Sequence, residues 1–326
     1  MVTIKDIARV AGVSYSTVSK ALNNSPLVQE KTKQKILKIA EELGYQPNIA
    51  AKKLVSNKSK TIGVVWPTVN RVTLSTIVTK INEEIENASY SMILSINPLN
   101  SAVNMFKRFQ VDGIVVFDDQ ELSDQHLEAN IPIVFLGGTN GRFPSIDVCR
   151  RDAFYNAVQY LHSLGHRHLA FVGHLPHRNN RQFEKYIGFT EALIHLGINP
   201  QPEMFINTEG LYLYHGYEAM KKLLKSDYQP TAVVGGSYEI TEGIIRAVKE
   251  AGLKIPDDIS VIGYDNIPQM ENLEVPVTAV GAPVDKIAKT TVDVLISHIN
   301  NPSEKAKVYK VEPEIFERKS CRPISE

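Results

Sequence analysis

Residues 2–24 read VTIKDIARVAGVSYSTVSKALNN and divide into two short amphipathic segments on either side of a turn, AGVS. Thr3 can cap the first segment, because Asp6 follows three residues later as in a capping box. Ser14 can cap the second segment, which we expect to cover about residues 15–23. The stretch therefore predicts two short helices joined by a glycine-containing turn.

A third amphipathic segment, near residues 30–43, places apolar side chains at the i, i+3, i+4, i+7 spacing of a helix and ends at Gly44. Two helices joined by a tight turn and braced by a third make a helix-turn-helix unit, in which the start of the second helix contacts base edges. Those positions here hold Tyr15, Ser16, Thr17 and, one turn further, Lys20. Lysine prefers the N7 and O6 acceptors of guanine, whereas serine and threonine serve several bases. The alternative is a solvated surface helix without a ligand.

The distribution of charge favours nucleic-acid binding. Residues 1–60 hold eleven Lys or Arg against four Asp or Glu, a net charge of +7. The rest of the 326-residue chain holds 25 against 32, so the chain as a whole is formally neutral. A basic segment attached to an acidic body is typical of a module that binds a polyanion, because lysine and arginine release counterions from a phosphate backbone.

A short alanine-rich segment, NIAAKKLVS at residues 48–56, follows Pro47 and precedes a polar run. Nine residues are too few for a stable isolated helix in water, so we expect this segment to fold only against a partner. The chain then divides into a helix-turn-helix domain at residues 1–46, a hinge helix and linker at 47–60, and a body at 61–326.

The body alternates strand-length apolar runs with helix-length amphipathic segments, the pattern of a parallel sheet with crossover helices. The expected strands are 62–66, 92–96, 113–117 and 133–136 in a first series, and 168–172, 231–234 and 259–264 in a second. We expect an α/β body of two parallel-sheet lobes. Lobe one would take about residues 61–160 plus 281–305, and lobe two about 161–280 plus the C-terminal segment.

The composition excludes several classes of protein. With 43% apolar and 22% charged residues the chain is expected to fold, and its N-terminus is charged where a secretory signal needs an apolar run. Two cysteines, Cys149 and Cys321, cannot build a disulfide framework, and no stretch approaches the roughly 20 apolar residues of a membrane span. We expect a cytoplasmic protein without membrane contact.

No motif indicates catalysis, a metal or a cofactor. Histidines 162, 166, 168, 174 and 177 lack the helical i, i+4 spacing with an adjacent carboxylate that a zinc site favours. Neither a Walker loop, a GxGxxG motif nor a GxSxG elbow occurs, and Cys149, without a histidine at a recognisable spacing, is expected to be an ordinary strand residue. We expect no enzyme activity and no cofactor.

The run at residues 2–24, followed by the third helix and GYQPNIAAKKL, resembles the DNA-binding head and hinge of the lactose/galactose/purine repressor (LacI/GalR) family of bacterial transcription regulators. The similarity continues through TIGVVWP, VDGIVVF, SLGHRHLAFVG, GFTEAL, KIPDDISVIGYDN and VDKIAK, in family order, to about Arg318. It implies a periplasmic-binding-protein-like pair of lobes with a small-molecule cleft between them. It also implies a homodimer on pseudo-palindromic double-stranded operator DNA.

By this resemblance Tyr15, Ser16 and Lys20 match base-reading residues, and Leu54 matches a hinge leucine that family members insert into the minor groove. The alternative for Leu54 is a linker residue that packs on the body. The full set of expected DNA contacts is Thr3, Tyr15, Ser16, Thr17, Lys20, Asn23, Asn48, Ala51 and Leu54.

The resemblance also places an effector site. Asp152 and Asp265 match family positions that hydrogen-bond a sugar-like ligand, but Lys185 stands where many relatives carry arginine and lacks its bidentate fork. Ser237-Tyr238 stands where relatives typically show Asn-Asp or Ser-Asp. These departures, with Arg178 and Arg181 nearby, permit a uronate or sugar phosphate as well as a neutral sugar, although the cations are equally compatible with surface charges. The expected effector contacts are Asp152, Lys185, Ser237, Tyr238 and Asp265.

The sequence thus predicts a transcriptional regulator that represses carbohydrate-utilisation genes under the control of a small effector. The competing hypothesis is a ligand-binding module or an enzyme built on the two-lobed body. No heptad-bearing tail follows Arg318, which favours a dimer over a tetramer. The effector, the operator sequence and the choice between induction and co-repression stay open.

Overall fold

The computed structural model describes residues 2–22, 24–45, 58–118, 130–138, 142–175 and 181–324. The chain divides into two units, Met1–Ser59 and Lys60–Glu326, which we call the head and the body. Among the described residues no helix combines the length and the apolar character needed to cross a membrane.

The head consists of three helices around a small apolar core that includes Ile7, Val18 and Ile36. The helices are α1 (Ile4–Ala11), α2 (Tyr15–Leu22) and α3 (Glu30–Glu42). Both predicted caps are confirmed. The Asp6 carboxylate accepts the Thr3 backbone N–H at 3.0 Å, and Ser14 Oγ accepts the Thr17 N–H at 3.1 Å.

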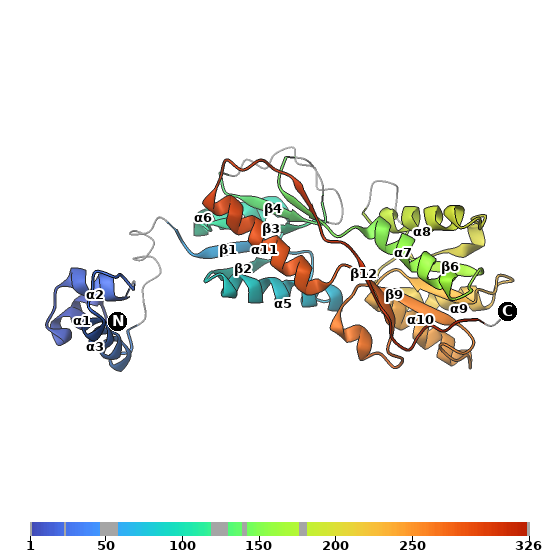
Figure 1. Ribbon diagram of the computed structural model, residues 1–326, viewed down its shortest axis with the longest axis horizontal. Helices are drawn as coiled ribbons and strands as arrows, with labels where there is room; N and C mark the ends of the chain where they lie inside the picture. The colour runs from blue at the N-terminus through green and yellow to red at the C-terminus, as the bar shows by residue number, and fades with distance from the viewer. Residues whose placement is uncertain are drawn as a thin grey trace. The chain divides into compact units, whose positions relative to one another are not determined.

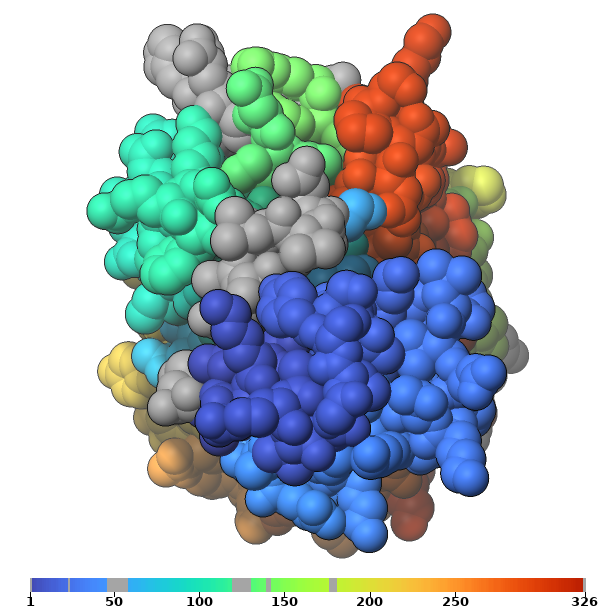
Figure 2. Space-filling view, turned by 90° about the vertical axis from the view of Figure 1, so that its left-hand side faces the viewer, coloured from blue at the N-terminus to red at the C-terminus, as the bar shows by residue number. Residues whose placement is uncertain are grey.

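The turn between α1 and α2 depends on Gly12, whose φ of 71° lies in the left-handed region that favours glycine. Lys35 on α3 donates to the Ala11 carbonyl at 2.9 Å and so ties the third helix to the end of the first. In the space-filling view of Figure 2 the head forms one closely packed group of blue atoms. The helix-turn-helix geometry is therefore fixed by contacts within the head itself.

Two six-stranded sheets form the body and lie side by side in Figure 1. The first is parallel throughout, in the order β11-β5-β4-β3-β1-β2. Its strands are β1 (Thr61–Val65), β2 (Ser91–Ser95), β3 (Gly113–Phe117), β4 (Ile133–Leu136), β5 (Ser145–Asp147) and β11 (Val308–Lys310). Alternate strand residues face opposite sides. Val64 and Val115 pack with α5 (Val72–Asn87) and α11 (Val284–Asn300), whereas Val65 and Ile114 pack with α6 (Leu99–Phe109).

The second sheet has the order β12-β10-β9-β8-β6-β7, and only β12 runs antiparallel to its neighbour. Its strands are β6 (Leu169–Gly173), β7 (Phe205–Asn207), β8 (Ala232–Gly235), β9 (Ser260–Tyr264), β10 (Thr278–Gly281) and β12 (Glu314–Phe316). One face packs against α7 (Arg150–Ser163) and α8 (Phe183–His195), and the other against α9 (Leu213–Leu224) and α10 (Tyr238–Glu250). Two short 3-10 turns, η1 (Pro202–Met204) and η2 (Pro268–Glu271), complete the described elements.

We call the first sheet with α5, α6 and α11 lobe one, and the second sheet with α7–α10 lobe two. The crossing between them differs from the prediction of about residue 160. Phe154, Val158 and Leu161 of α7 lie in the core of lobe two, so the chain crosses before α7 begins. Cys149 is not a strand residue as expected, because it precedes α7 with a φ of 49°.

Candidate functional site

The start of α2 is the exposed part of the helix-turn-helix. The Tyr15 side chain is 55% exposed, and Ser16 and Lys20 are exposed as well. Thr17 is half-buried, and its hydroxyl lies 2.8 Å from Ser14 Oγ. Val18 faces the core, so one side of the helix holds it in place while the other is free for a partner.

Thr3 is exposed and holds the cap of α1. The remaining residues predicted to contact DNA, Asn23, Asn48, Ala51 and Leu54, lie outside the described residues, as does Arg178. Their roles stay predictions.

A cleft lies between the two lobes of the body. Its empty volume is about 720 Å³, including the part continuous with solvent, which is in the range of small-molecule sites. Lobe one contributes the start of α5 and the ends of β3 and β4, and lobe two contributes α8 and the end of β9. This edge of open parallel sheets is the usual place for a ligand.

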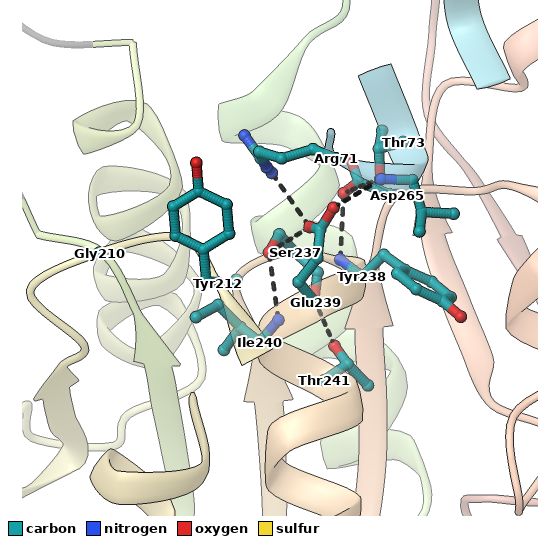
Figure 3. A network of polar contacts seen from close by, with 12 residues as sticks. Arg71, Thr73, Gly210, Tyr212, Ser237, Tyr238, Glu239, Ile240, Thr241 and Asp265 are labelled. Atoms are coloured by element: carbon teal, nitrogen blue, oxygen red, sulfur yellow. Dashed lines mark hydrogen bonds and ion pairs between the residues drawn. The ribbon is translucent and has the colours of Figure 1, made fainter. Parts of the chain in front are cut away.

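Polar side chains of the two lobes bond to each other beside this cleft (Figure 3). Glu239, at the start of α10, accepts the Val72 backbone N–H at 2.9 Å and lies 3.2 Å from Arg71 Nη2. The side chains of Arg71 and Glu239 are only 11% and 9% exposed, so this ion pair is largely shielded from water.

A second bond crosses between the lobes at Asp265, whose Oδ2 accepts the Thr73 hydroxyl at 2.9 Å and the Tyr238 backbone N–H at 3.1 Å. Asp265 has a φ of 86°, a strained conformation for a residue with a side chain. We call Arg71, Thr73, Glu239 and Asp265 the interlobe network.

Lys185 and Asp265, two of the residues expected to contact the effector, both line the cleft. The Lys185 side chain is 3% exposed, its Nζ donates to the Gly236 carbonyl at 2.7 Å, and the ammonium lies 4.0 Å from the centre of the Tyr264 ring. The carbonyl and the ring face together stabilise a buried cation at this position.

Ser237 and Tyr238 do not line the cleft. The Ser237 hydroxyl is buried, accepts the Ile240 N–H at 3.3 Å to cap α10, and lies 3.3 Å from Glu239 Oε2. The Tyr238 ring packs in the apolar core shared with lobe one, and burial raises the pKa of its phenol. In this arrangement both residues position α10 and Asp265.

Asp152 lies apart from Lys185 and Asp265. It is exposed in the first turn of α7 and lines a neighbouring hollow together with Arg151 and Arg181. The hollow and the cleft share two residues, Gly137 and Arg150.

Sequence reasoning missed Arg71, Thr73, Glu239 and Arg150. Each lies in the first turn of a helix or immediately before it, close to the sheet edge that holds Asp265. For Arg71, Thr73 and Glu239, the position after a predicted strand was the available signal.

Within the described residues one group of potential metal ligands, Cys149, Asp152 and Glu312, brings its donor atoms within 4.8 Å of one another. Burial, helped by the nearby Asp147 carboxylate, raises the pKa of the Cys149 thiol to about 12. The thiol is therefore protonated at neutral pH in the absence of a metal.

Comparison with known proteins agrees with both parts of this architecture. Residues 3–48 match the family described as bacterial regulatory proteins, lacI family, and residues 158–321 match a periplasmic binding protein-like domain. Catabolite control protein A of Priestia megaterium is 31% identical to this chain, over 98% of the chain and 99% of its own length. The chain belongs to the lacI family.

Other members of the lacI family match over the same length. The probable HTH-type transcriptional repressor ExuR of Bacillus subtilis strain 168 is 32% identical over 100% of both chains. The Lac repressor dimer bound to operator and the anti-inducer ONPF superposes with a TM-score of 0.82 at 26% identity, over 98% of this chain and 99% of the repressor. A LacI family regulator from Enterococcus faecium with bound ribose gives a TM-score of 0.72 at 25% identity, over 81% of this chain and 100% of that one.

Membership in the lacI family confirms the predicted fold class and the predicted function of a DNA-binding transcriptional regulator. The helical head is the DNA-binding part, and the two-lobed body is the effector-binding part.

Proposed function

We propose that this regulator represses carbohydrate-utilisation genes by binding a pseudo-palindromic operator as a homodimer, in the cytoplasm, under the control of a small sugar-like effector. The observation that carries the proposal is the interlobe network beside the cleft, because it gives a ligand in the cleft a direct route to the lobe arrangement. Relatives named as repressors, and the Lac repressor dimer bound to operator, support the repressor and dimer assignments. The ribose-bound regulator supports a sugar-like effector.

The protein would act by a shift between two lobe arrangements. A ligand that binds in the cleft contacts the same residues that join the lobes, so it favours one arrangement over the other. In a dimer, rotation of the lobes would change the spacing of the two hinge segments on DNA. The resulting coupling between effector and operator is typically about 1–3 kcal/mol in such systems.

The DNA-binding half of the proposal is tested by Lys20→Ala, since Lys20 is exposed on α2. If Lys20 contacts a guanine, specific operator affinity should fall by about 1–3 kcal/mol in a fluorescence-anisotropy titration. Lys38→Ala is the matched control, because Lys38 is an exposed lysine on α3 and should change affinity little. An equal loss on the operator and on a scrambled duplex would make Lys20 a phosphate contact instead.

A further inference from the structure

Among the residues that the structure describes, Arg150 is a largely buried cation without a hydrogen-bond or ion-pair partner. It is the first residue of α7 and is 8% exposed, yet no hydrogen bond or ion pair joins its guanidinium to any residue that the structure describes. The other buried cations beside the cleft differ in this respect, since Arg71 pairs with Glu239 and Lys185 donates to a carbonyl. A buried charge without a counter-ion is costly, so a ligand that supplies one should be bound strongly.

The backbone around Arg150 leaves its guanidinium open to the cleft. Arg150 lines both the cleft and the neighbouring hollow of Asp152. Gly137 follows β4 with a φ of 95°, and a Cβ at this position would lie 3.2 Å from Arg150 Nη2 and 2.7 Å from the Asp118 carbonyl. A side chain at residue 137 would therefore cover the guanidinium that glycine leaves accessible.

Three cations, Arg71, Arg150 and Lys185, line the cleft. Arg71 pairs with Glu239 and Lys185 donates to the Gly236 carbonyl, so Arg150 is the one of these three that a ligand anion can pair with. A carboxylate brings a single charge to this guanidinium, whereas a phosphate dianion would bring a second charge into the cleft that Asp265 also lines. This arrangement favours a monocarboxylate over a sugar phosphate.

The cleft also offers what a polyhydroxylated ring requires. The Asp265 carboxylate uses Oδ2 for both of its bonds within the protein, so Oδ1 can accept a ligand hydroxyl. Apolar side chains of lobe one such as Phe117 and Leu136 also line the cleft and can pack against the C–H face of a sugar.

We infer that the effector is a small sugar acid whose carboxylate is bound by the Arg150 guanidinium through two parallel N–H···O bonds. The inference rests on the proposed function, since it assigns a chemical class to the effector of the same cleft. Arg150 is then the residue that selects an acid over the corresponding neutral sugar.

Calorimetric titration of the full-length protein tests this selection with matched probes. The probes are glucuronate, gluconate, glucose and glucose 6-phosphate, with the four corresponding galactose compounds. At least one sugar acid should bind about 10-fold or more tightly than its neutral and phosphorylated counterparts. Arg150→Gln should abolish that preference and Arg150→Lys should retain part of it, because lysine keeps the charge but loses the fork. Arg246→Gln makes the same charge change on an exposed part of α10 and should leave the preference intact.

Thermal unfolding separates a ligand contact from a structural role. In the absence of ligand, Arg150→Gln should unfold at the same temperature as the wild type or higher, because it removes an uncompensated buried charge. The variant should also lose the stabilisation that the sugar acid gives the wild type. A lower unfolding temperature without ligand would indicate a structural partner for Arg150 and would overturn the inference.

Three results of the titration would also overturn it: a neutral sugar or sugar phosphate that binds more tightly than its acid, an unchanged preference in Arg150→Gln, or no binding by any probe. Operator titration without ligand tests the proposed function separately. A protein that binds its operator but prefers a neutral sugar refutes only the role of Arg150, whereas a protein that binds no operator refutes the proposed function.

Discussion

Replacing Glu239 with glutamine should weaken the contact between the lobes. Glu239 belongs to lobe two, and two of its contacts, the Val72 N–H and the Arg71 guanidinium, come from the start of α5 in lobe one. Glutamine has nearly the same shape and can still accept the Val72 N–H, so the substitution removes the charge and leaves the packing in place.

The burial of the ion pair sets the size of the effect. Exposed pairs contribute about 0–1 kcal/mol, whereas removing one partner of a buried pair costs about 3–5 kcal/mol. Exposures of 11% and 9% for Arg71 and Glu239 place this pair near the buried limit. Because glutamine keeps a neutral acceptor worth about 1 kcal/mol, we expect a cost of about 2–4 kcal/mol for Glu239→Gln. A cost of 2 kcal/mol corresponds to about a 30-fold larger population of separated lobes.

Hydrogen exchange at the Val72 amide measures this population, since the Val72 N–H is bonded across the lobes and not within its own helix. Its exchange rate should rise by about 30-fold or more in Glu239→Gln, while the amides of β6 inside lobe two stay protected. Glu250→Gln, which alters an exposed pair with Arg246 on the same helix, should leave Val72 unchanged. Unchanged exchange in Glu239→Gln would refute the reasoning and would show that other contacts hold the lobes.

Three further predictions concern other parts of the molecule. Burial holds the pKa of His166 below its ordinary value of 6.5, so the folded state resists protonation. The contribution of His166 to thermal stability should therefore be fully present above pH 6.5 and be lost as the pH drops below it, so stability should fall less over that range in His166→Gln. Gly188→Ala should destabilise the body by about 1–3 kcal/mol or more in thermal unfolding, because a Cβ there would lie 2.0 Å from the Arg151 carbonyl of the adjoining helix. Leu54→Ala should reduce both operator affinity and DNA bending in a circular-permutation gel shift, and an unchanged bend at saturating protein would exclude a wedge.

The elements that the sequence predicted best are those whose pattern of apolar residues lies entirely within the element. The strands at residues 113–117 and 133–136 have the predicted bounds, because each is a buried apolar run with a clear end. The start of helix α5 at Val72 is not a local feature of this kind, since its first N–H is bonded to Glu239, 167 residues away. A contact of that kind leaves no trace in the periodicity around residue 72.

The residues of the candidate site also divide into those that the sequence could predict and those that depend on contacts between distant segments. Lys185 and Asp265 could be named because their surroundings resemble a known family, and both line the cleft. Arg71 and Arg150 belong to segments far apart in sequence, and only the folding of two sheets against one another brings them to one cavity. Ser237 was predicted to face the ligand, but as the cap of α10 its hydroxyl bonds to the helix, which depends on where that helix begins.

The interlobe network also connects the chemistry of the cleft with the direction of the regulatory response. A ligand that displaces Arg71 from Glu239 favours separated lobes, whereas one that bonds to Asp265 and leaves the pair intact favours the present arrangement. Because coupling is reciprocal, the lobe arrangement that binds the operator decides which of these ligands is an inducer. Glu239→Gln favours separated lobes without any ligand. If it lowers operator affinity, the joined arrangement binds DNA and a displacing effector induces. If it raises operator affinity, the same effector acts as a co-repressor.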